Sequence, residues 1–112
     1  MLQQRRAAAQ QVADCLIDAE RAIDNALAAA SGLVALLPTA RLDAGVAAEI
    51  GQDAIEHAMK TTNALVAARG GIVETHRQLA KTRDEVGLRT FSFGGLMPKA
   101  ADLTQPEVAN AA

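Results

Sequence analysis

Residues 12–37, VADCLIDAERAIDNALAAASGLVALL, decide the fold, because apolar side chains recur along them at helical spacing. The spacing alternates between four and three residues without a break, which is the pattern of a long helix packed along another helix. No proline occurs between Leu2 and Leu37, so we expect a helix over residues 3–37, about 50 Å long at 1.5 Å per residue. The predicted contact row, widened by Leu27 and Val34, is Val12, Leu16, Ala19, Ile23, Ala26, Ala30, Leu33 and Leu37.

Pro38 marks the predicted end of this helix, because proline lacks an amide hydrogen and disfavours helix in the residue before it. The connection that follows is short, which makes the next helix an antiparallel neighbour of the first. Thr39 or Asp43 could cap that helix. We favour Asp43, so the second helix is expected over residues 43–86.

The second helix carries two apolar rows, which together form a stripe wide enough to face more than one neighbour. One row could meet the first helix of the same chain, and the other could meet a second copy. This pattern favours a four-helix bundle made by a dimer of hairpins. The rows are Val46, Ile50, Ala54, Ala58, Leu65, Ala68, Ile72 and Leu79, and Ile55, Met59, Val66, Val73 and Ala80.

Two adjacent glycines, Gly70 and Gly71, interrupt the second helix. Each costs about 1 kcal/mol relative to alanine in a helix interior. No polar turn residues surround the pair, so we expect the helix to continue as far as Gly87, a suitable helix stop. The alternative is a true break, which would give helices near 43–69 and 72–86.

Small side chains dominate the composition, with 26 alanines against two phenylalanines and no tryptophan or tyrosine. Alanine favours helix but has little surface to bury, so the helices should form readily around a thin core. A single cysteine excludes a disulfide within the chain. Association with a second copy or with a partner protein is the remaining way to add stability.

The charge distribution argues against several classes of partner. A formal net charge of −2 and a pI of about 5.6 are unlike those of proteins that bind nucleic acid or anionic membrane surfaces. The longest uncharged and mostly apolar run is 26–37, shorter than the roughly 20 residues of a membrane span. No apolar segment follows Arg5 and Arg6 as in a secretory signal, and the lone Cys15 fits a reducing compartment. We therefore expect a cytoplasmic protein.

Carboxylates and histidines on bundle helices are the raw material of di-metal sites, which use Glu-x-x-His motifs. That motif is absent here, since Glu56 and His57 are adjacent and point in different directions. We interpret the carboxylates and His57 near the start of the second helix as a solvated helix face, and His76 as a residue at the edge of the core. No catalytic or cofactor-binding residue is predicted. The alternative, a metal-binding bundle, would draw on Glu49, Asp53, Glu56, His57 and His76.

The C-terminal segment, residues 88–112, differs in composition and holds both aromatic residues. We expect an extended tail that folds back and covers the end of the bundle with bulky groups. A docking peptide for another protein is the alternative, because aromatic residues and methionine are enriched at interfaces. The candidate interaction residues are Phe91, Phe93, Leu96 and Met97.

The sequence thus predicts an all-α protein, with a long antiparallel helical hairpin over 1–87 and a tail over 88–112. We expect the hairpin to dimerise into a four-helix bundle. The favoured function is a non-enzymatic protein–protein interaction or assembly role, with metal binding as the alternative. A third hypothesis is a small-ligand site between subunits near Gly70 and Gly71.

Overall fold

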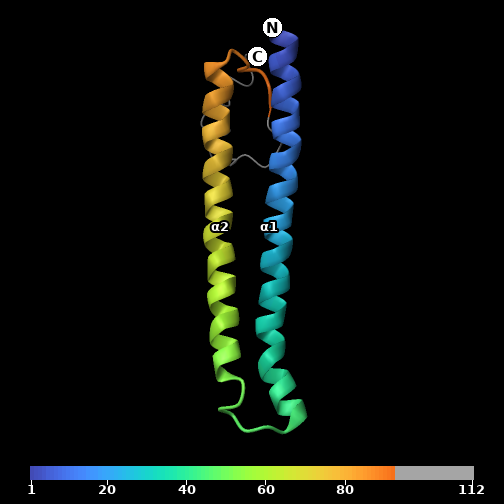
Figure 1. Ribbon diagram of the computed structural model, residues 1–112, viewed down its shortest axis with the longest axis vertical. Helices are drawn as coiled ribbons and strands as arrows, with labels where there is room; N and C mark the ends of the chain where they lie inside the picture. Colours follow the sequence, from blue (N-terminus) through green and yellow to red (C-terminus); the bar gives the residue numbers. More distant parts are fainter. Residues whose placement is uncertain (93–112) are drawn as a thin grey trace, which may run out of the picture. The chain divides into compact units, whose positions relative to one another are not determined.

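The computed structural model describes residues 1–92, which form two α-helices and no strand (Figure 1). Helix α1 spans Leu2–Ala44 and helix α2 spans Gln52–Glu85. The two helices run in opposite directions and are joined by the connection 45–51. The predicted all-α fold with a helical hairpin is therefore confirmed.

The sequence predicted that the first helix ends at Pro38. The helix instead continues through this residue to Ala44. The end is set by Gly45, whose φ of 67° is a left-handed conformation that glycine adopts without steric conflict. The amide of Gly45 donates to the Leu42 carbonyl at 3.1 Å, and the Val46 amide donates to the Arg41 carbonyl at 3.3 Å. These two bonds form a Schellman motif, which satisfies carbonyls that the helix end leaves open.

The start of the second helix also differs from the prediction, because α2 begins at Gln52 and Asp43 lies in the last turn of α1. The other end agrees with the prediction, since Gly87 follows α2 with a φ of 83°. The amide of Leu88 donates to the Arg83 carbonyl at 2.9 Å, so α2 ends in the same motif as α1.

Between these ends α2 passes through Gly70 and Gly71 without a break. The predicted continuity of the second helix is therefore confirmed, and the alternative of separate helices near 43–69 and 72–86 is wrong.

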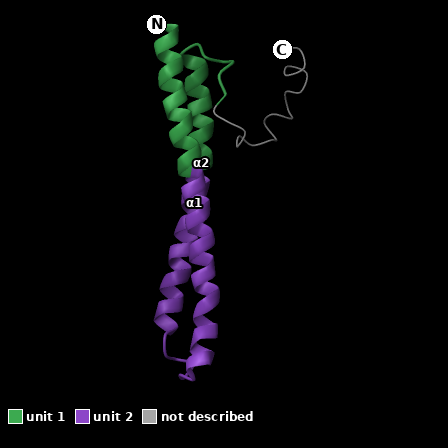
Figure 2. Ribbon diagram, turned by 90° about the vertical axis from the view of Figure 1, so that its right-hand side faces the viewer, with its two compact units in different colours: residues 1–19, 72–112 green, residues 20–71 purple. Residues whose placement is uncertain are grey.

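The chain divides into two compact units, each containing part of both helices (Figure 2). The first unit holds Met1–Ala19 together with the described residues from Ile72 onward. All the buried residues in the described part of the chain belong to it: Ala13, Leu16, His76 and Leu88. Ile72, Leu79 and Phe91 pack against Ala13 and Leu16 and complete a small core.

The second unit, Glu20–Gly71, contains no buried residue. Its less exposed residues are half-buried and recur at alternating steps of three and four, as expected where two helices pack along each other. On α1 they include Ile23, Leu27, Ala30, Val34 and Leu37, and on α2 they are Ile55, Ala58, Thr62 and Leu65.

The contact row predicted for the first helix is partly correct. Its members Leu16, Ala19, Ile23, Ala30 and Leu37 are buried or half-buried, as predicted. At three other positions the next residue along is the less exposed one. Ala13 replaces Val12, and Leu27 and Val34, which the prediction gave as widening the row, replace Ala26 and Leu33. As a result Val12 is 40% exposed and Leu33 is 52% exposed.

Candidate interaction surface

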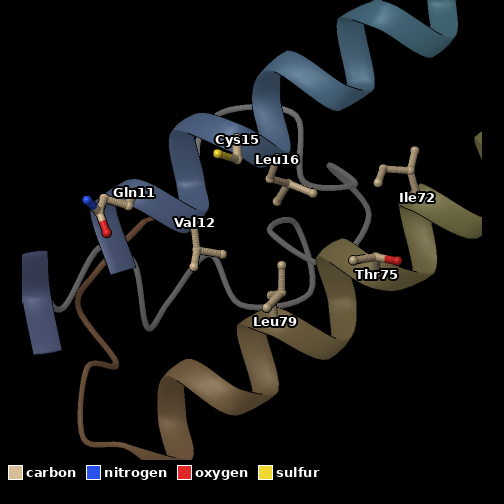
Figure 3. A pocket seen from close by; sticks show the side chains of 7 residues that line it. All are labelled: Gln11, Val12, Cys15, Leu16, Ile72, Thr75 and Leu79. Atoms are coloured by element: carbon tan, nitrogen blue, oxygen red, sulfur yellow. The ribbon is translucent and has the colours of Figure 1, made fainter. Parts of the chain in front are cut away.

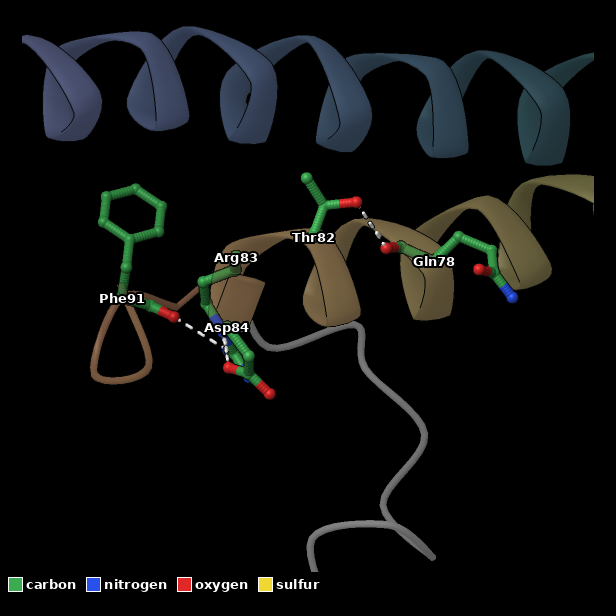
Figure 4. Close-up of polar contacts among 5 residues, drawn as sticks. All are labelled: Gln78, Thr82, Arg83, Asp84 and Phe91. Atoms are coloured by element: carbon green, nitrogen blue, oxygen red, sulfur yellow. Dashed lines mark hydrogen bonds and ion pairs between the residues drawn. The ribbon is translucent and has the colours of Figure 1, made fainter. Parts of the chain in front are cut away.

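The C-terminal end of α2 holds Phe91 against the hairpin (Figure 4). The Nη1 atom of Arg83 donates a hydrogen bond of 2.8 Å to the Phe91 carbonyl oxygen, and its Nε pairs with Asp84 at 3.2 Å. The Phe91 amide also donates to the Leu88 carbonyl at 2.9 Å. Phe91 is half-buried against the Ala13 and Leu16 cluster, so it contributes to the core of the first unit. The other candidate interaction residues, Phe93, Leu96 and Met97, lie outside the described residues.

Two apolar grooves lie on the first unit. The larger, with a volume of about 380 Å³, runs between the helices (Figure 3). The smaller, about 220 Å³, has Arg5 and Arg83 among its lining residues, and Arg5 donates to the Val86 carbonyl at 3.1 Å. Val12 and Leu79 line both grooves, so their apolar surface is continuous. The larger groove is lined by Gln11, Val12, Cys15, Leu16, Ile72, Thr75 and Leu79.

The two helices of the second unit are also joined by an ion pair that lies largely in water. Arg69 Nε donates to Asp24 Oδ1 at 2.7 Å, and both side chains are about half exposed, at 54% and 55%. Several large hydrophobic side chains of this unit are also exposed: Leu33, Leu36, Leu42, Val46, Ile50, Met59 and Val66. The unit therefore presents apolar surface that its own helices do not cover.

The metal-site candidates are not brought together within residues 1–92. Glu49 lies in the connection, and Asp53, Glu56 and His57 lie on the first turns of α2, all of them exposed. Glu56 accepts a hydrogen bond of 3.3 Å from Gln52 Nε2. No group of three or more His, Cys, Asp or Glu side chains that could hold a metal ion occurs in this part of the chain.

His76 lies deeper than the sequence indicated. Its side chain is 1% exposed, whereas the apolar stripe predicted a residue at the edge of the core. It belongs to the first unit, whereas the other four candidates, Glu49, Asp53, Glu56 and His57, belong to the second. On α2 it shares a face with Ile72 and Leu79, four residues after the one and three before the other. His76 is thus part of the packed interior.

Helix α1 contains an 18-residue window with a mean hydropathy of 1.3 and meets the length and composition requirements of a membrane span. The sequence prediction differed because it considered only the uncharged run 26–37, whereas a span tolerates isolated charges. Core helices of soluble proteins, which are mostly buried, and N-terminal signal sequences share this property, and 0% of this window is buried. The hydropathy of α1 is therefore compatible with more than one environment.

Comparison of the chain with protein-family models, with curated proteins and with solved structures finds no match. The class of molecule is therefore defined by its own geometry: residues 1–92 form an α-helical hairpin with a small core and extensive exposed apolar surface.

Proposed function

We propose that this chain is a non-enzymatic assembly protein that works as a homo-oligomer, with a dimer of hairpins as the basic form. The observation that carries this proposal is the size of the core. Among residues 1–92 the buried hydrophobic side chains are Ala13, Leu16 and Leu88. Burial of one leucine stabilises a fold by roughly 1.5–3 kcal/mol, whereas ordering the backbone of a single residue opposes folding by about 1–2 kcal/mol.

The exposed apolar side chains supply the surface that association would cover. Leu36 is 58% exposed and Val66 is 54% exposed, although each lies within a regular helix. Amphipathic helices in proteins gain most of their stability from packing rather than from intrinsic propensity. A second hairpin is the simplest source of that packing, because pairs of hairpins form four-helix bundles.

Size-exclusion chromatography with light scattering tests this proposal on the full chain. We expect a mass of at least about twice the 11.6 kDa of one chain at micromolar concentration. The midpoint of thermal unfolding should rise with protein concentration, because association stabilises the folded state by mass action. A well-folded particle of 11.6 kDa whose melting temperature is independent of concentration would refute the proposal.

A further inference from the structure

A second line of apolar residues runs along α1 beside the line that packs on α2. Its members recur at alternating steps of three and four, and none carries a charge or an amide. Ala19 is half-buried and the others are exposed. We call this line the outer row: Val12, Cys15, Ala19, Ala22, Ala26, Ala29, Leu33 and Leu36.

The outer row points in the direction of a second helix neighbour. Cys15 precedes Leu16 by one residue, which is about 100° around a helix. Leu16 is buried in the contact with α2, so the outer row faces roughly at right angles to α2. In a four-helix bundle each helix has two adjacent neighbours in directions about that far apart.

The opposite flank of α1 is not equivalent. There the residues that follow the α2-facing line by one position include Asp24, Ser31 and Pro38. Asp24 is engaged in its ion pair with Arg69. Between residues 12 and 37, only one flank of α1 is therefore apolar throughout, and a bundle partner would pack on that flank.

We infer that a second copy of this chain packs on the outer row, with its own outer row antiparallel to the first and residue 24 at the midpoint. This inference rests on the proposed self-assembly and specifies its interface. A row without charges meets itself without like-charge repulsion, as an interface with two-fold symmetry requires. The sizes of the side chains also match when the row is reversed. Leu36 then lies opposite Val12 of the second copy, and Leu33 lies opposite Cys15 of the second copy.

The middle of the antiparallel contact consists of alanines, which allow helix axes to approach to about 8 Å. On the side of the outer row, helix α2 also carries small residues near the level of residue 24. The Asp24–Arg69 pair sets residue 69 beside residue 24. Ala68 lies seven residues before Thr75, two helical turns away, and therefore on the face where Thr75 lines the groove with Cys15. At Gly71 an added Cβ would meet no atom within 4 Å.

A lipid bilayer is the other apolar environment that α1 could meet, given the hydropathy of its 18-residue window. The ion pair argues against it. Arg69 of α2 lies beside Asp24 of α1, so a hairpin crossing a bilayer would carry both charges into the hydrocarbon, where ionised side chains are strongly disfavoured. A second copy covers the outer row and leaves this pair in water.

Cross-linking of the full chain tests the inference, because Cys15 is the only cysteine. In the variant Leu33→Cys, mild oxidation should give a covalent dimer. Mass spectrometry should find in it a disulfide that joins Cys15 of one copy to the cysteine introduced at position 33 of the other. The matched control is Ala35→Cys, since residue 35 is exposed and about 200° around the helix from residue 33. It should give little cross-linking to Cys15, as should the unaltered chain.

A charge placed in the outer row provides a second test. Leu33→Asp should raise the dimer dissociation constant more than about 100-fold, because it buries an unpaired carboxylate in the contact. Ala35→Asp should change that constant less than about threefold. Circular dichroism of both variants checks that the helices remain.

The outcomes separate this inference from the proposed function. A dimer in which residue 35 cross-links as well as residue 33, or in which Leu33→Asp associates normally, overturns the outer-row interface but leaves self-assembly intact. A monomer by light scattering overturns both. A monomer that floats with vesicles of equal parts phosphatidylcholine and phosphatidylglycerol would show that the outer row contacts lipid rather than a second copy.

Discussion

Arg69 and Asp24 form an ion pair with a 2.7 Å separation between Nε and Oδ1, in which each side chain is about half exposed. Exposed pairs contribute little, because water screens their attraction and two side chains must be ordered. In a double-mutant cycle with Asp24→Asn and Arg69→Gln, we expect a coupling free energy below about 1 kcal/mol. Urea unfolding at one fixed protein concentration measures it. The coupling should shrink in 1 M salt, and a coupling above about 2 kcal/mol that salt leaves unchanged would contradict this view.

Gly87 and Gly70 should respond oppositely to the same substitution. Gly87 has a φ of 83°, so Gly87→Ala should destabilise the protein by about 1–2 kcal/mol through backbone strain. Gly70 lies inside α2, where Gly70→Ala should stabilise by about 1 kcal/mol through helix propensity. An added Cβ would meet no atom within 4 Å at either site, so new side-chain contacts do not contribute to the difference between the two variants. Urea unfolding of both variants checks the prediction. Changes of the same sign in their free energies of unfolding would contradict it.

Pro38 lies inside α1, where it removes one backbone hydrogen bond. Pro38→Ala should therefore raise the free energy of unfolding, by as much as about 3 kcal/mol. Thermal and urea unfolding measure this gain. The neighbouring substitution Thr39→Ala, at an exposed position, is the control and should stay within about 0.5 kcal/mol of the unaltered chain. A loss of stability in Pro38→Ala would contradict this expectation.

The helical hairpin could be predicted because its signal is spread over many residues. The alternation of threes and fours along residues 12–37 requires a long helix with a helical neighbour. The end of α2 was also predictable, since Gly87 has a single role as a left-handed cap. The end of α1 could not be predicted, because both Pro38 and Gly45 are residues that can end a helix. Only the tertiary structure decides which of them does so.

The candidate surface was harder to predict than the fold. Rows that differ by one residue have the same period, so the pattern cannot decide whether Ala26 or Leu27 faces α2. The opposing helix makes that choice, and it leaves Val12 and Leu33 exposed. The groove that joins Cys15 to Thr75 depends on the same pairing of distant segments, so no local signal indicated it.

Two leucines of α1 test where the stability of a single hairpin originates. Leu16 is 4% exposed in the core of the first unit, and Leu42 is 67% exposed near the end of the helix. Leu16→Ala should cost about 2–5 kcal/mol, because it removes buried methyl groups and leaves a cavity. Leu42→Ala should cost less than about 0.5 kcal/mol. Neither residue belongs to the outer row, so light scattering should report unchanged association for any variant that remains folded. Equal losses in urea unfolding would mean that the buried residues near Leu16 do not form the folding core.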